Sequence, residues 1–122
     1  APNFVLGDAH ELPFEDGSFD TVVMAEIPEH LENPQKAIGE ALRVSRERVL
    51  ITCPDEFNWA ARYRPFAPPP LFKGTPPAVH RRYYTRQLLE YELRQAGARK
   101  FAYEHLECGG MAFHLVKIEE VA

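Results

Sequence analysis

The sequence predicts an α/β fold with a mainly parallel sheet that ends in an antiparallel hairpin. Apolar runs typical of strands alternate along the chain with segments of helical periodicity. The last two apolar runs flank a glycine turn at residues 108–110, which is typical of a hairpin. With 122 residues, the chain is long enough for one compact domain and too short for two.

Two strands are predicted before the first helix. Asn3–Leu6 is a short apolar run that ends at Gly7. Asp16-Gly17-Ser18 is a turn signal. The run that follows it, Phe19–Ala25, is apolar enough to be a strand buried on both faces.

A helix and a third strand come next. Asn33 can cap the helix, and Pro34 fits its first position. The apolar residues of this helix recur at helical spacing and form one stripe: Ala37, Ile38, Ala41 and Leu42. The run Arg48–Cys53 predicts another buried strand, which Pro54 ends.

Residues 55–79 interrupt this alternation with a proline-rich stretch. The aromatic residues Trp59, Tyr63 and Phe66 lie between its prolines. A connection of this length inside a small domain is usually either a functional loop or a disordered one. The interleaved aromatic residues favour a loop that packs over something.

A second helix and the hairpin complete the predicted fold. Thr85 can cap a helix over Arg86–Ala96, which Gly97 ends. The inward face of this helix would be formed by Leu88, Leu89 and Leu93. Lys100–Glu104 and Met111–Ile118 are predicted to pair as the closing antiparallel strands.

The composition excludes two classes of partner. Hydrophobic residues make up 45% of the chain and charged residues 26%, which is ordinary for a globular protein. A net charge near −4 argues against a nucleic-acid binder that relies on a basic surface. No apolar run approaches the roughly 20 residues that span a bilayer, so we expect no membrane partner.

The two cysteines point to a reducing compartment. Cys53 and Cys108 lie far apart and form no CxxC motif. Cys53 closes a β-branched run, which favours a buried free thiol over a disulfide. We therefore expect a cytoplasmic protein.

Three segments, in this order, carry a resemblance to a known family. Gly7–Phe14 is followed by Ser18–Asp20 and a hydrophobic strand, and Arg48–Pro54 matches the next strand. His80–Thr85 begins a late segment that runs to Gly97. Together they resemble class I S-adenosylmethionine-dependent methyltransferases. The resemblance implies a partial Rossmann-like sheet, S-adenosyl-L-methionine as cofactor, and a small molecule that is methylated at oxygen, nitrogen or carbon.

The resemblance assigns Asp8 and Ala9 to the cofactor's adenine. A carboxylate can accept a hydrogen bond from the adenine amino group, and the alanine amide can donate one to a ring nitrogen. The alternative is a turn at the end of a strand, in which Asp8 caps the backbone that follows.

Glu26, Glu29 and His30 would share one face of a helix, because they are spaced i, i+3 and i+4. They follow the strand Phe19–Ala25, and ligands bind at the carboxyl ends of strands in open α/β sheets. The E-x-x-E-H pattern resembles that of quinone-biosynthesis O-methyltransferases, where it is associated with metal binding. Four roles stay open: structural capping, cofactor contact by Glu26, a metal site, and His30 as a general base that Glu29 orients. Pro28 disfavours the helical geometry that the metal site requires.

The proline-rich stretch supplies the candidate substrate residues. In one interpretation His80 is a catalytic residue at a substrate pocket, with Trp59, Tyr63 and Phe66 as its apolar walls. In the other, His80 anchors the loop.

The resemblance also implies cofactor-binding elements that would come before Asp8. The family uses a glycine-rich loop for the methionine part of the cofactor and an acidic residue at the end of the second strand for the ribose. No G-x-G stands before Asp8. We therefore expect residues 1–122 to form a single incomplete methyltransferase-like domain that binds the cofactor weakly or not at all by itself.

An incomplete domain would leave the strand Phe19–Ala25 as an exposed apolar edge. We expect one of three outcomes: the segment at Phe4 pairs with this edge, two chains pair as a homo-oligomer, or an N-terminal half completes the domain. The alternative to an enzyme is a non-catalytic, methyltransferase-like interaction or assembly module. A domain for another nucleotide ranks last, because the sequence contains no phosphate-binding loop.

Overall fold

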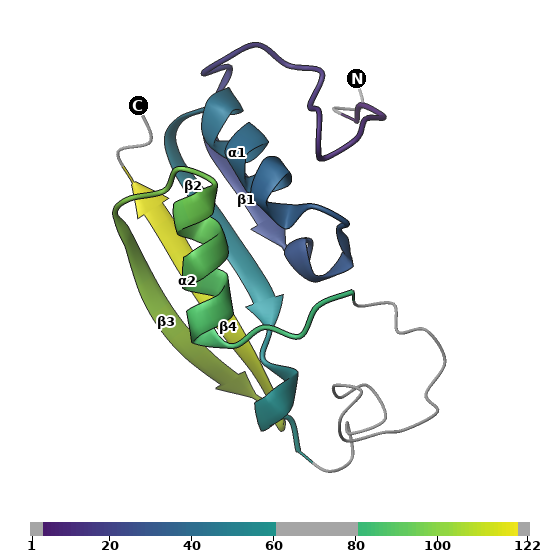
Figure 1. Ribbon diagram of the computed structural model, residues 1–122, viewed down its shortest axis with the longest axis vertical. Helices are drawn as coiled ribbons and strands as arrows, with labels where there is room; N and C mark the ends of the chain where they lie inside the picture. The colour runs from purple at the N-terminus through teal and green to yellow at the C-terminus, as the bar shows by residue number, and fades with distance from the viewer. Residues whose placement is uncertain (1–3, 61–80, 120–122) are drawn as a thin grey trace.

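The computed structural model describes residues 4–60 and 81–119 (Figure 1). A four-stranded sheet has the order β1-β2-β4-β3, formed by Phe19–Ala25, Ser45–Pro54, Met111–Glu119 and Phe101–Cys108. Strand β1 pairs with β2 in parallel, and β4 is antiparallel to both β2 and β3. Three strands therefore run in one direction, and the predicted α/β fold with a closing hairpin is confirmed.

Two helices, α1 (Pro34–Val44) and α2 (Arg86–Gln95), cover one face of this sheet (Figure 1). Their predicted caps are confirmed. The Asn33 side chain accepts a hydrogen bond from the amide of Lys36, and Thr85 accepts one from the amide of Leu88, both at 3.1 Å. Gly97 ends α2 with a φ of 107°, a backbone conformation that favours glycine. No helix among the described residues is long and apolar enough to cross a membrane.

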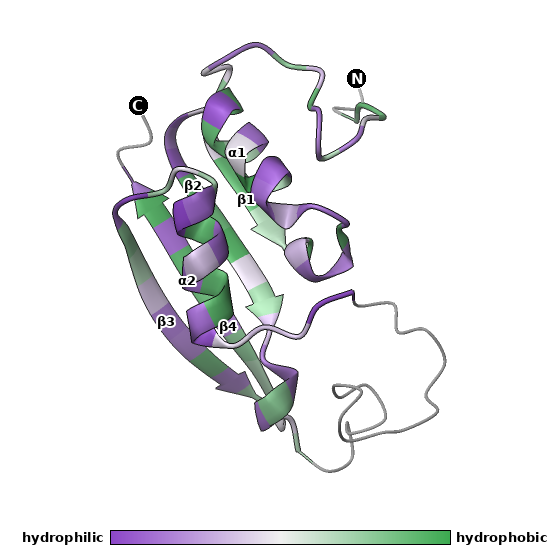
Figure 2. Ribbon diagram, in the orientation of Figure 1, coloured by the Kyte–Doolittle hydropathy of each residue, from purple (hydrophilic) through white to green (hydrophobic). Residues whose placement is uncertain are grey.

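The core lies between the helices and the covered face of the sheet, and Figure 2 shows the hydrophobic stretches of the central strands there. Its fully buried side chains include Ile38, Val49, Ile51, Leu89, Leu93 and Val116. Because side chains alternate along a strand, the other face of the sheet carries a second apolar set. On that face Val23 is 61% exposed.

Two predictions about the first strands are wrong. Phe4–Leu6 forms no strand and is exposed, because it has no neighbouring strand to pair with in the described part of the chain. It also does not pair with β1, so the first of the three expected outcomes does not occur. Strand β1 is not buried on both faces: it lies at the sheet edge, and among its residues Met24 alone is buried.

The cysteines are both free, Cys53 buried and Cys108 exposed, which confirms the thiol prediction. Burial, and then the negative charge of nearby carboxylates, raises the pKa of the Cys53 thiol. Cys53 is therefore a packing residue of the core.

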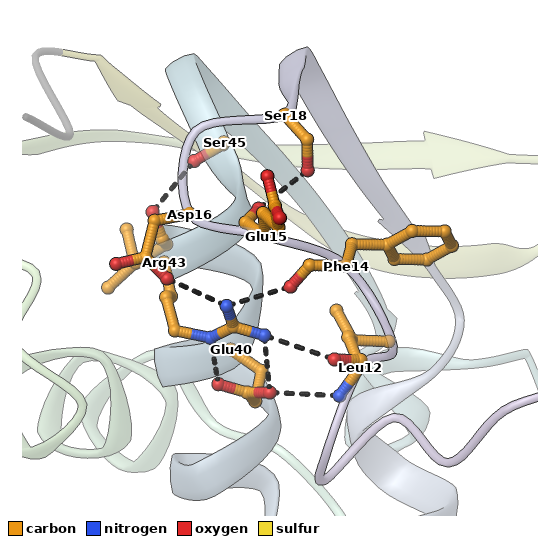
Figure 3. Close-up of polar contacts among 9 residues, drawn as sticks. Leu12, Phe14, Glu15, Asp16, Ser18, Glu40, Arg43 and Ser45 are labelled. Atoms are coloured by element: carbon orange, nitrogen blue, oxygen red, sulfur yellow. Dashed lines mark hydrogen bonds and ion pairs between the residues drawn. The ribbon is translucent and has the colours of Figure 1, made fainter.

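Arg43 of α1 holds the loop between residues 12 and 18 on the helix (Figure 3). Its guanidinium donates to the carbonyls of Leu12 and Phe14 at 3.1 and 2.8 Å and to Asp16 at 2.8 Å. Glu40 accepts from Arg43 Nε at 2.6 Å and from the amide of Leu12 at 2.8 Å. The planar, five-donor guanidinium can satisfy all these acceptors at once, and a lysine cannot.

We predict that Arg43→Gln loosens this loop without unfolding the sheet. The amide of Leu12 donates to the Glu40 carboxylate, and the amide of Gly17 donates to the carbonyl of Arg43. Both amides should exchange with solvent about tenfold faster in the variant, because the loop they belong to is held less firmly on α1. Hydrogen exchange followed by NMR or mass spectrometry measures this change. Arg46→Gln, which removes an exposed ion pair with Asp20, is the matched control. Unchanged exchange at Leu12 would contradict the assignment.

Candidate functional site

The parallel pairing of β1 with β2 brings two acidic turns to one edge of the sheet. Ala25 of β1 lies beside Thr52 of β2, so both strands end at the same edge. A single 3-10 turn, η1 (Pro28–His30), follows β1, and another, η2 (Glu56–Asn58), follows β2. We call the carboxyl groups of Glu26, Glu29 and Glu56 the acidic edge.

Glu26 leaves β1 in a left-handed conformation, with a φ of 56°. A non-glycine residue rarely adopts this conformation unless its surroundings hold it there. Here the Glu26 amide donates to the carbonyl of Thr52 at 2.9 Å and lies 3.2 Å from the Thr52 hydroxyl. Burial raises the pKa of its half-buried carboxyl group, and Oε2 has no hydrogen-bond partner.

Among the predicted site residues that the structure describes, Glu29 is the most buried, with 1% of its surface exposed. Burial and the negative charge of Glu26 raise the pKa of Glu29 to about 7. Neither carboxyl oxygen has a hydrogen bond, although Nε2 of His30 lies 3.5 Å from Oε2. The backbone carbonyl of Glu29 accepts from the amides of Arg81 and Arg82 at 2.6 and 3.3 Å, which attaches this later segment to η1.

Glu56 belongs to the acidic edge, and the sequence analysis missed it. It is fully buried, and burial, followed by the charges of Glu29 and Glu26, raises its pKa to about 8. A signal was present in the sequence. Glu56 follows the strand next to β1, and the ends of adjacent parallel strands meet at one edge.

The predicted helical face of Glu26, Glu29 and His30 does not form, because η1 is one turn long and Glu26 precedes it. Within residues 4–60 and 81–119, no three His, Cys, Asp or Glu side chains are placed to hold a metal ion together.

Asp8 forms the turn that the capping alternative describes. Its Oδ1 accepts from the backbone amide and from Nδ1 of His10, both at 2.8 Å, and these bonds lower the pKa of Asp8. The other ring nitrogen of His10 accepts from the amide of Asn33 at 3.1 Å, which fixes the turn beside α1. The carboxylate stays largely exposed, while Ala9 packs against the core.

Trp59 is buried, and its indole donates to the carbonyl of Ala112 at 2.9 Å. It therefore anchors η2 on β4. The other residues predicted for the substrate pocket, His80, Tyr63 and Phe66, lie outside the described residues.

Comparison with known proteins shows a likeness to methyltransferases. Residues 1–53 match the family model described as a methyltransferase domain. Norajmaline N-methyltransferase from Rauvolfia serpentina is 44% identical over 43 residues, which cover 35% of this chain and 15% of that protein. Demethylmenaquinone methyltransferase from Renibacterium salmoninarum is 43% identical over 44 residues, 36% of this chain and 19% of that protein. The matched segments span less than a fifth of these relatives.

The fold extends the likeness to nearly the whole chain. A SAM-dependent methyltransferase from Thermotoga maritima superposes with a TM-score of 0.66 and 21% identity, over 93% of this chain and 61% of that chain. The resemblance to class I methyltransferases is confirmed. The acidic edge therefore lies at the carboxyl end of a methyltransferase-type sheet.

We predict that Glu29→Gln changes the pH dependence of stability. The pKa of Glu29 is raised in the fold, so its contribution to stability is fully present below about pH 4.5 and is lost as pH rises through about 7. The neutral glutamine removes this loss. Urea unfolding should show similar stabilities near pH 5 and a variant more stable by about 1 to 3 kcal/mol near pH 9. The exposed Glu47→Gln is the control. Equal differences at both pH values would count against a buried, ionisable Glu29.

Proposed function

We propose that this chain is part of a SAM-dependent methyltransferase that acts on a small molecule. The match of residues 1–53 to the methyltransferase family carries the proposal. The two curated relatives described above are named as methyltransferases, and the Thermotoga maritima structure with a similar fold is titled as one as well. The free, reduced cysteines agree with a cytoplasmic location.

The side chains of Asp8 and Glu26 fit the chemistry of the cofactor. The exposed Asp8 carboxylate uses Oδ1 for its own turn and can offer Oδ2 to the adenine amino group. Glu26 has a buried carboxyl oxygen without a hydrogen bond, and the positive sulfonium group would offset the cost of its charge.

S-adenosyl-L-methionine, when bound, supplies an already activated methyl group. The protein's task is then mostly to align the acceptor with that group and to exclude water. Asp8 and Ala9 would orient the adenine, and the acidic edge would favour a cation nearby. His30 and His80 stay candidates for a catalytic role, and Trp59, Tyr63 and Phe66 for the substrate pocket.

A specific observation favours the second candidate, an interaction or assembly module. Strand β1 is at the edge of the described sheet, and its side chain Val23, on the uncovered face, is 61% exposed. An unpaired apolar edge is a template for another chain. We propose that β1 pairs either with a second copy of this chain or with an N-terminal half of the domain.

Titration of S-adenosylhomocysteine by calorimetry tests the first proposal. We expect binding by the full natural protein that contains this chain, and about tenfold weaker binding after Asp8→Asn, because a charge-assisted hydrogen bond is lost. Asparagine can keep the turn, and the exposed Glu15→Gln is the control. If the full protein does not bind, the enzyme proposal fails.

Sedimentation velocity at micromolar concentration tests the second. Val23→Lys should reduce self-association, because a charge at the edge opposes strand pairing. Tyr91→Lys places the same charge at an exposed aromatic residue on α2, away from the edge. A chain that is strictly monomeric, with β1 protected from hydrogen exchange, would refute pairing with a second copy of this chain.

A further inference from the structure

A second polar cluster joins the turn after β2 to β3, on the side of β2 that lies away from β1. Asp55 is 4% exposed, and its Oδ2 lies 2.8 Å from Nε2 of His105 on β3. The side-chain amide of Asn58 donates to the same oxygen at 2.6 Å. The Asp55 amide donates to the carbonyl of Ala112, which fixes the carboxylate on β4. Asp55 therefore holds His105 from a rigid position.

This contact determines where the free electron pair of His105 lies. A carboxylate accepts hydrogen bonds, so Nε2 of His105 carries the hydrogen. In the neutral ring, Nδ1 then holds the lone pair. Nδ1 has no hydrogen-bond partner among the described residues, and the side chain is 34% exposed. An imidazole held this way is arranged to accept a proton.

The neighbouring histidine is not available for the same task. Nε2 of His114 donates to the carbonyl of Tyr84 at 2.9 Å, so its Nδ1 accepts from the hydroxyl of Tyr103 at 2.5 Å. Burial lowers the pKa of His114, which favours its neutral form. His114 is thus a structural residue that supports the wall beside His105.

His105 opens into a hollow of about 340 Å³, within the size range of small-molecule sites. Aromatic side chains from two sides line it, Phe57 of η2 and Tyr103 of β3. The guanidinium of Arg86 lies 4.3 Å from the centre of the Tyr103 ring and lines the hollow as well. The hollow therefore combines two aromatic side chains with polar groups, among them the imidazole of His105.

We propose that this hollow binds an aromatic hydroxyl compound and that His105, positioned by Asp55, accepts the hydroxyl proton. The role of this compound as the methyl acceptor rests on the proposed function. In the step itself the O–H bond breaks, its electron pair stays on oxygen, and the proton bonds to Nδ1 of His105. The Asp55 carboxylate stabilises the imidazolium that forms.

The arrangement favours a hydroxyl compound over an amine. A neutral amine has a free electron pair and is a nucleophile without losing a proton first. A phenol is a poor nucleophile until it is ionised, so a positioned base accelerates its reaction, typically by about 10²–10⁴-fold. An aromatic ring also matches the walls formed by Phe57 and Tyr103.

The probe is p-nitrophenol, whose phenolate absorbs visible light and whose neutral form does not. At a pH where the free dye is mostly neutral, dye bound to the full natural protein should contain about ten times more phenolate. His105→Gln should return bound dye to the ratio of free dye. Glu104→Gln, the neighbouring exposed residue on β3, should behave as wild type. Failure of the wild type to bind the dye, or equal phenolate with His105→Gln, would overturn the proposal.

Two further measurements distinguish a failure of the proposed site from a failure of the proposed function. Nitrogen NMR of the ring should show hydrogen on Nε2 of His105 in the wild type and a mixture of tautomers in Asp55→Asn. A wild-type ring with hydrogen on Nδ1 would also overturn the proposal. Calorimetry with S-adenosylhomocysteine on the same samples tests the proposed function separately. Phenolate formation without such binding supports the site and refutes the methyltransferase role.

Discussion

The parallel pairing of β1 with β2 is the constraint on which the rest of the structure depends. It requires a crossover, which α1 supplies, and this places α1 on the sheet. It also makes both strands end at one edge, so the turns that follow them meet. Among the described strands, β1 has β2 as a neighbour on one side and none on the other. The acidic edge, the core and the open sheet edge thus follow from one register.

The acidic edge is costly for a purely structural element. Removing a carboxylate from water without a hydrogen bond is unfavourable, and a second buried carboxylate nearby raises the cost further. The raised pKa values of Glu29 and Glu56, about 7 and about 8, let these carboxyl groups bind protons near neutral pH, and protonation lowers this cost. Buried carboxyl groups with raised pKa values gather at functional sites, where a cationic ligand can offset their charge. A hydrophobic residue would fill the same space at lower cost.

Local signals predicted the elements better than the site. Asn33 and Thr85 cap their helices through bonds within three residues, so short sequence patterns were sufficient. Strand formation requires a neighbour, and the run at Phe4 has none within residues 4–60 and 81–119, which is why its apolar pattern alone gave a wrong prediction. Asp55 and His105 are far apart in sequence and meet through the pairing of β2, β4 and β3. Their spacing alone carried no signal.

Asp55 and Glu56, two consecutive residues after β2, lie in two different environments. Glu56 interacts electrostatically with the acids that follow β1, whereas Asp55 binds a histidine on β3, on the other side. Because β2 is a central strand, the turn that follows it contacts residues on both of its sides. One carboxyl group has its pKa raised among like charges, and the other has two hydrogen-bond donors. This difference suits the first to a cation and the second to orienting a base. The two proposed functions, binding a cation and accepting a proton, would therefore be separated by the turn that follows β2.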